Sequence, residues 1–180
     1  NFLIKNMTLL IFTDIDGTFI NNDTFDEGLN TKTISELIQA QHSVVFNTSK
    51  TFDEVDYFQK KIETSLSFIC ETGGGIYIAN DNLKTTEASR GAYQVLYESR
   101  KVTEYKDQIQ SEIIRNYRDD LTFFDDLSIE EQSSLSGLSG HDLSLASRRD
   151  FSILIKWKST KSKYDEFKLF LKQFKLNLIT

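Results

Sequence analysis

The sequence contains a single cysteine, Cys70, and no proline among its 180 residues. One cysteine cannot form an internal disulfide, so the composition suits a reducing compartment, and we expect the chain in the cytoplasm. Cys70 lies in an apolar run and is expected to be a small buried side chain. An average chain of this length would hold roughly nine prolines. Because Asn, Lys, Ile and Phe are frequent, the absence of proline indicates a compositional bias.

Long apolar stretches and an excess of basic residues are also missing. No apolar run approaches the roughly 18 residues that cross a membrane. The net charge is -6, from 21 basic and 27 acidic residues, which argues against a nucleic-acid binder. We therefore expect neither a membrane nor a nucleic-acid partner. The 39% of hydrophobic and 12% of aromatic residues are sufficient for a sizeable core.

Short apolar runs alternate with helical patterns in the first part of the chain. The runs at 9–13, 43–47 and 67–70 are typical of strands in a parallel sheet. The first run is almost continuously apolar, so we expect a central strand that is buried on both faces. Helix-like spacing between the runs predicts an α/β fold with a parallel sheet and right-handed crossovers.

The pattern changes after about residue 80. We expect residues 1–80 to form one domain and residues 81–180 a separate α+β lobe with its own helices. The strands expected in this lobe lie at 92–97, 121–124, 151–157 and 176–179.

Polar side chains follow two of the predicted strands. Asp14 and Asp16 come directly after the first strand, and Thr48, Ser49 and Lys50 follow the second. Because ligands bind beyond the carboxyl ends of parallel strands, we expect both groups at one edge of the sheet.

The paired carboxylates are suited to phosphoryl transfer. Asp14 is placed to attack phosphorus and form an aspartyl-phosphate, and Asp16 to protonate the leaving oxygen and then deprotonate water. Gly17 permits an unusual backbone angle, and the Thr18 hydroxyl can hold the local backbone. Carboxylate and phosphate repel each other, so we expect Mg²⁺, held by the Asp14 carboxylate and the Asp16 backbone carbonyl.

The second polar group is suited to an anion. Thr48 or Ser49 can donate hydrogen bonds to phosphoryl oxygens, Lys50 adds positive charge, and a helix beginning near Thr51 offers free amides. A plain helix cap is the alternative for this group, as a plain Asp-Gly turn is for the acidic motif. A calcium loop fits poorly, because its twelfth position counted from Asp14 would be Phe25 rather than glutamate.

At these residues the chain resembles the haloacid-dehalogenase-like (HAD) phosphatase superfamily. The run Phe12-Thr13-Asp14-Ile15-Asp16-Gly17-Thr18 is similar to its first motif, and Thr48 stands at the Ser/Thr of its second. The runs 47–51 and 68–77 resemble the mannosyl-3-phosphoglycerate phosphatase subfamily, although Thr72 stands where Asn is usual. The resemblance implies a Rossmann-like three-layer core with an inserted α+β cap, and a phosphorylated sugar as substrate.

The second half is similar to the cap of that subfamily. The segment Arg148-Arg149-Asp150-Phe151 resembles an Arg-Glu-aromatic pattern, with Asp150 in place of Glu. The resemblance implies that Arg148 or Arg149 binds a carboxylate or phosphate of the substrate. A solvated helix end is the alternative for both. His141 is expected on the surface at a helix start.

The family pattern continues with a lysine motif and an acidic Gly-Asp-x-x-x-Asp motif, and neither occurs before the last residue. The main hypothesis is therefore a phosphatase whose core is incomplete in this chain. The rivals are a general sugar-phosphate or nucleotide phosphatase, and an inactive relative that binds a phospho-ligand or partner chain. An exposed first strand would favour dimerisation through its edge.

Overall fold

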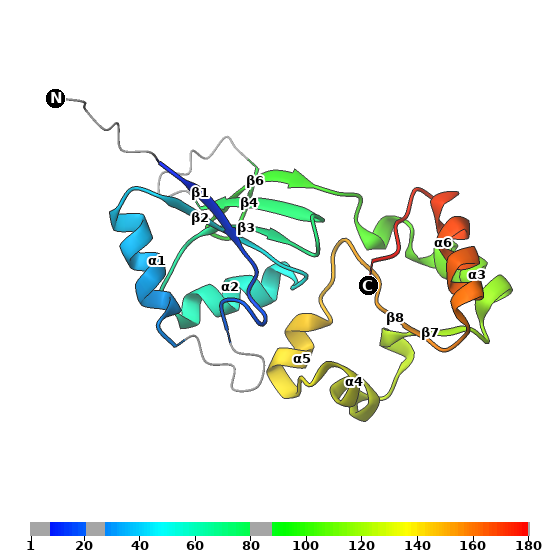
Figure 1. Cartoon of the computed structure of the whole chain (residues 1–180). Helices are drawn as coiled ribbons and strands as arrows, with labels where there is room; N and C mark the ends of the chain where they lie inside the picture. Colours follow the sequence, from blue (N-terminus) through cyan, green and yellow to red (C-terminus); the bar gives the residue numbers. More distant parts are fainter. Residues whose placement is uncertain (1–7, 21–27, 80–87, 180) are drawn as a thin grey trace. The chain divides into compact units, whose positions relative to one another are not determined.

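The structure is a computed structural model that describes residues 8–20, 28–79 and 88–179 (Figure 1). The chain divides into two compact units, Asn1–Ser99 and Arg100–Thr180, which we describe separately. The division lies later than the expected boundary between residues 80 and 81. The reason is that β6, which we had assigned to the second lobe, pairs with β4 in the sheet of the first unit.

The first unit is built on a six-stranded sheet with the order β1-β2-β3-β4-β6-β5. The strands β1, β2 and β3 are parallel, as the alternating sequence pattern predicted, and β4, β6 and β5 add antiparallel pairs. The elements are β1 (Leu10–Thr13), α1 (Asn30–Gln39), β2 (Ser43–Asn47), α2 (Phe52–Lys61), β3 (Ser67–Cys70), β4 (Gly75–Ala79), β5 (Ser89–Arg90) and β6 (Tyr93–Glu98).

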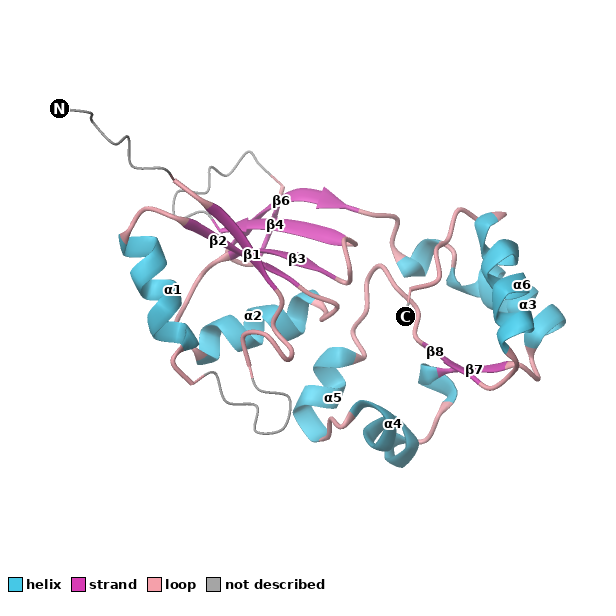
Figure 2. Cartoon of the chain, in the orientation of Figure 1, coloured by secondary structure: helices cyan, strands magenta, loops and turns pink. Residues whose placement is uncertain are grey.

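β1 is not the central strand, buried on both faces, that the sequence predicted. It lies at the end of the described sheet, and the side chains of Leu10 and Phe12 are 61% and 55% exposed. Both helices of the unit lie on the opposite face, where Val44 and Phe46 are buried (Figure 2). Apolarity alone predicted burial of β1, but burial needs a covering layer, and the described elements supply one on a single face.

An aromatic cluster holds α2 on the covered face. Phe52 packs against Phe68, Tyr77 and Tyr93 with ring centroids 4.7 to 5.8 Å apart. The Arg90 guanidinium lies 4.0 Å from the centroid of the Phe52 ring. Because Phe52 is the first residue of α2, this packing fixes the start of the helix against the sheet. Cys70 is fully buried, as predicted.

The second unit packs helices against a two-stranded antiparallel sheet of β7 and β8. Its buried core includes Ile109, Ile113, Phe167 and Leu171. The elements are η1 (Val102–Glu104), α3 (Lys106–Tyr117), β7 (Leu121–Phe123), η2 (Phe124–Asp126), α4 (Ile129–Ser136), α5 (Gly140–Ala146), β8 (Ile155–Trp157) and α6 (Lys161–Lys172).

The end of the described chain differs from the expected last strand at 176–179. No strand forms over these residues. Leu176 and Leu178 instead pack, partly buried, against the core of the unit. The alternating apolar residues therefore arise because one side of this segment packs against the core of the unit, and not because the segment is a strand. His141 lies in the first turn of α5 and is exposed, as predicted.

None of the described helices has the length and apolarity needed to cross a membrane.

Candidate active site

The ends of β1 and β2 bring the predicted polar residues to one edge of the sheet. Thr13, the last residue of β1, lies opposite Phe46 in the parallel register, so Asp14 follows β1 close to where Thr48 follows β2. The side chains also meet, because the Asp16 Oδ2 and Lys50 Nζ atoms lie 3.0 Å apart. The structure thus joins two segments that are more than thirty residues apart in the sequence.

The acidic motif forms a closed turn around a buried residue. Ile15 is fully buried, and its carbonyl oxygen accepts hydrogen bonds from the amides of Phe19 and Ile20 at 3.0 and 2.9 Å. Gly17 has a φ of +68°, in the left-handed region that favours glycine. Of the two carboxylates that flank Ile15, that of Asp14 is exposed and that of Asp16 is half-buried.

Asp14 is exposed and is fixed by its own neighbours. One carboxylate oxygen, Oδ1, accepts a 2.7 Å hydrogen bond from the amide of Ile15. The Thr13 hydroxyl donates to the Asp14 carbonyl oxygen at 3.0 Å. A carboxylate held by a backbone amide keeps a defined orientation, as a nucleophile requires. Thr18 lies exposed in the same turn.

The second polar loop is anchored to the sheet and opens α2. Thr48 is buried, and its amide donates to the Ile69 carbonyl oxygen at 3.0 Å. The Thr48 hydroxyl oxygen accepts from the Lys50 amide at 3.3 Å, which leaves its proton to donate elsewhere. Ser49 is exposed. Thr51 caps α2, so the amides of the first turn of the helix face this loop.

Lys50 links the two loops. It also forms an ion pair with Glu54, a residue that the sequence did not lead us to assign to the site. The Lys50 ammonium lies 3.0 Å from Asp16 and 3.5 Å from Glu54, and only 16% of the side chain is exposed. Glu54 also accepts a hydrogen bond from the Thr51 amide at 2.8 Å. The spacing of four residues between Lys50 and Glu54 was the available signal. The charge of Lys50 is therefore shared between two carboxylates.

A strained turn between β3 and β4 supports the second loop. Glu71 and Thr72 have φ of 46° and 57°, and Gly73 follows at 96°. A left-handed residue other than glycine costs about 1 kcal/mol or more. The amides of Glu71 and Thr72 donate to the carbonyl oxygens of Lys50 and Thr48 at 2.9 and 3.1 Å. These two hydrogen bonds hold the second loop in place. The glycines of this turn did not by themselves predict that role.

The donor atoms at the acidic turn suit a hard cation. Carboxylate and carbonyl oxygens are the ligands that Mg²⁺ prefers, and it binds through one or two carboxylates with waters and substrate phosphate. The Asp14 carboxylate and the Asp16 carbonyl supply such atoms. Over the described parts of the chain, no group of three His, Cys, Asp or Glu residues could hold a metal. The oxygen atoms of Asp14 and Asp16 are thus of the type that Mg²⁺ prefers.

The two predicted arginines belong to the second unit. Arg148 is exposed, and the Arg149 Nε atom donates to the Ser152 hydroxyl at 2.7 Å. Their approach to Asp14 stays a prediction, since the two units are described separately.

A parallel sheet with paired carboxylates after its first strand and an anion-suited loop after its second defines a class of α/β proteins that handle phosphoryl groups. The sequence profile of the haloacid dehalogenase-like hydrolases matches residues 11–131, and the chain belongs to this family. The family resemblance inferred from the sequence is thereby confirmed.

Two relatives carry the name of the expected subfamily. The chain is 30% identical over 149 residues to a glucosyl-3-phosphoglycerate/mannosyl-3-phosphoglycerate phosphatase of Methanococcoides burtonii, covering 81% of this chain and 54% of the relative. It is 30% identical over 155 residues to a mannosyl-3-phosphoglycerate phosphatase of Pyrococcus furiosus, covering 84% of this chain and 62% of the relative. The chain thus spans between about half and three fifths of these relatives.

Solved structures share the fold. A phosphatase of the haloalkanoate (HAD) enzyme superfamily from Bacteroides thetaiotaomicron aligns with a TM-score of 0.61 at 9% identity, covering 94% of this chain and 62% of that one. A protein from Thermotoga maritima aligns with a TM-score of 0.56 at 17% identity, covering 93% and 62%. These alignments confirm the predicted α/β fold.

Proposed function

We propose that this chain carries the nucleophile half of a phosphatase that hydrolyses phosphate monoesters through an aspartyl-phosphate on Asp14. The single observation that carries the proposal is the meeting of the acidic turn with the anion-suited loop, through the 3.0 Å contact between Asp16 and Lys50. The family membership and the names of the relatives support the same reaction class.

The first step uses the fixed carboxylate. A free oxygen of Asp14 attacks phosphorus and the bond from phosphorus to the ester oxygen breaks. Asp16, in the protonated form that this step requires, gives its proton to that leaving oxygen and becomes a carboxylate. In the second step Asp16 takes a proton from water, which attacks the aspartyl-phosphate. Phosphate leaves and the Asp14 carboxylate is regenerated.

The second loop would hold the phosphoryl group during both steps. The hydroxyl groups of Thr48 and Ser49 donate to phosphoryl oxygens, and the N-terminus of α2 contributes its free amides. Lys50 keeps positive charge beside the group while remaining close to Asp16. Gly17 and Thr18 shape the turn on the other side. Asp14 and the Asp16 carbonyl would hold Mg²⁺, which when bound offsets the negative charge of the phosphoryl group.

The substrate we propose is mannosyl-3-phosphoglycerate or a similar sugar phosphate, by analogy with the named relatives. The second unit would serve as a cap that selects the organic part of the substrate. Arg148 or Arg149 would bind its carboxylate. A reducing cytoplasm suits the lone buried Cys70.

The test is magnesium-dependent release of phosphate from mannosyl-3-phosphoglycerate by the full chain. Replacing Asp14 with Asn is expected to abolish release, because the amide is a poor nucleophile. The exposed carboxylate of Asp107, in the second unit, offers a matched control, and Asp107→Asn should keep full activity. Unchanged release by Asp14→Asn would refute the assigned nucleophile.

A second candidate function is binding without turnover. It is favoured by the lack, among the described residues, of a group of three potential metal ligands. In that case the chain would bind a phosphorylated ligand or a partner at the same loop. Calorimetric titration with Mg²⁺, together with the phosphate-release assay, separates the two candidates. Binding of Mg²⁺ accompanied by phosphate release supports catalysis. The absence of both Mg²⁺ binding and phosphate release supports the binding function.

We further propose that a second copy of the chain pairs along the outer edge of β1. An edge strand presents unpaired backbone groups, and here it also exposes the side chains of Leu10 and Phe12.

A further inference from the structure

A hollow in the second unit combines flat apolar side chains with two ammonium groups. It has a volume of about 360 Å³ and is lined by Trp157, Ser159, Lys161, Tyr164, Lys168 and Leu178. This volume lies within the range of about 300–1,000 Å³ that small-molecule sites occupy. Nothing in the proposed phosphatase reaction uses these residues.

The aromatic wall of the hollow is packed against the core of the second unit. Trp157 stacks on the buried Phe167 ring with centroids 5.4 Å apart and meets the Tyr164 ring edge-on at 5.6 Å. The Trp157 indole nitrogen also donates to the Thr160 carbonyl oxygen at 3.4 Å. One side of the indole is thus held by the core while the residue borders the hollow. A flat apolar ligand could pack on this wall with little loss of side-chain entropy.

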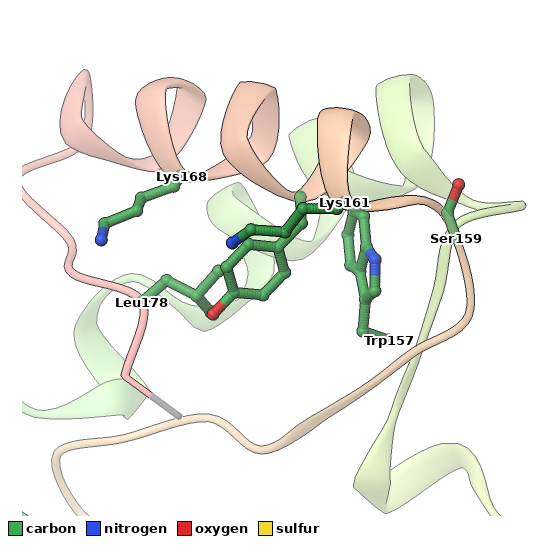
Figure 3. A pocket seen from close by; sticks show the side chains of 6 residues that line it. Trp157, Ser159, Lys161, Lys168 and Leu178 are labelled. Carbon is green, nitrogen blue, oxygen red and sulfur yellow. The ribbon is translucent and has the colours of Figure 1, made fainter.

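Two lysines of α6 give the hollow its charge. Lys161 and Lys168 extend from the helix on the side that Leu178 approaches (Figure 3). The Lys161 ammonium lies 4.6 Å from the Tyr164 ring centroid. Its ion pair with Asp165 is 3.2 Å long and exposed at both ends, so a ligand can compete with it easily.

Lys168 is the stronger candidate for anion binding. Within the part of the chain that the structure describes, its ammonium makes no ion pair, and none of the six lining residues is acidic. An ammonium group without an ion-pair partner, beside an apolar wall in a concave site, favours a ligand that has both an anionic group and an apolar part.

We propose that this hollow is a binding site for a small molecule that joins a flat ring to an anionic group. The ring packs on Trp157, Tyr164 and Leu178, and the anion, either a phosphoryl group or a carboxylate, binds Lys168 and Lys161. All six lining residues belong to the second unit, and the proposal does not depend on the proposed phosphatase reaction.

The probe is phenylphosphonate, whose carbon–phosphorus bond resists a phosphatase. Trp157 is the only tryptophan of the chain, so its fluorescence reports this site directly. Titration of the full chain should give a saturable change with a midpoint in about the millimolar range, as expected for a ligand of this size. Benzoate distinguishes carboxylate from phosphoryl recognition, while inorganic phosphate and benzyl alcohol carry the charge and the ring alone and should bind more weakly.

Lysine variants complete the test. Lys168→Gln should weaken binding of phenylphosphonate about fivefold, through loss of a charge-assisted contact. Lys172→Gln removes an exposed lysine of the same helix that does not line the hollow, and it should bind like the wild type. Both substitutions are on the surface, and circular dichroism verifies that the variants are folded. No saturable change in the wild type, or equal binding by the two variants, would overturn the proposal.

Discussion

Replacing Gln59 with leucine is expected to destabilise the first unit strongly. Gln59 is the one fully buried amide side chain on α2, and it ties this helix to the start of β3. Its Nε2 atom donates to the Leu66 carbonyl oxygen at 3.1 Å and to the Tyr93 hydroxyl at 3.3 Å. Its Oε1 atom accepts from the Leu66 amide. The side chain therefore satisfies both main-chain groups of a buried residue.

The magnitude follows from the groups that lose their partner. Leucine has a similar size but no polar atoms, so both main-chain groups of Leu66 become unsatisfied. Each costs about 1–3 kcal/mol. The apolar side chain recovers about 1 kcal/mol by burial, which leaves a net loss of about 3 kcal/mol. Such a loss is a large part of the stability of a typical domain.

Urea unfolding followed by circular dichroism measures the effect. With a slope of about 2 kcal/mol per molar, the midpoint of Gln59→Leu should fall by about 1.5 M. Gln39→Leu is the matched control, because Gln39 is an exposed residue at the end of α1. Its effect should stay within about 0.5 kcal/mol. A midpoint of Gln59→Leu equal to that of the control would refute the assignment of these hydrogen bonds as stabilising.

Two further predictions concern the second unit and the β1 edge. Hydrogen bonds from Ser159 and from Lys163 hold the pKa of the Asp120 carboxyl below its ordinary range. Because the folded-state pKa is lowered, this stabilisation is fully present above pH about 4 and is lost as the pH falls through the lowered value. Asp120→Asn should therefore be less stable than the wild type at pH 7 and closer to it at pH 3, in urea unfolding followed by Trp157 fluorescence. A gap between the two proteins that does not change with pH would contradict this reasoning. If a second copy pairs along β1, light scattering should show a dimer that Leu10→Lys converts to a monomer. Leu29→Lys, a control at a residue that is 79% exposed, should remain dimeric, and a monomeric wild type would exclude this pairing.

The sequence predicted the elements that local pattern controls. Short apolar runs predicted the parallel strands β1, β2 and β3, and the sequence also predicted the helix that begins near Thr51. These signals act over a few residues, so one sequence is enough to recognise them. The acidic motif and the loop after β2 were expected at one edge, because parallel strands of one sheet end at the same side.

Local sequence patterns did not predict the interactions between distant segments. The pairing of β6 with β4 moved the boundary between the units, because strand pairing depends on which edge is free rather than on local composition. The support of Lys50 and Thr48 by the strained turn at Glu71 and Thr72 is a contact between backbone groups. Backbone contacts of this kind leave little trace in residue identity.

By itself the sequence determined the residue types that carry chemistry, the order of the first strands and helices, and the family to which the chain belongs. Tertiary structure alone decided that β1 lies at the end of the sheet, with one face uncovered, among the residues that the structure describes. It also decided that Lys50 divides its charge between Asp16 and Glu54. The physical reason is that burial and ion pairing depend on what approaches a side chain in space. A periodic pattern specifies only which way that side chain faces.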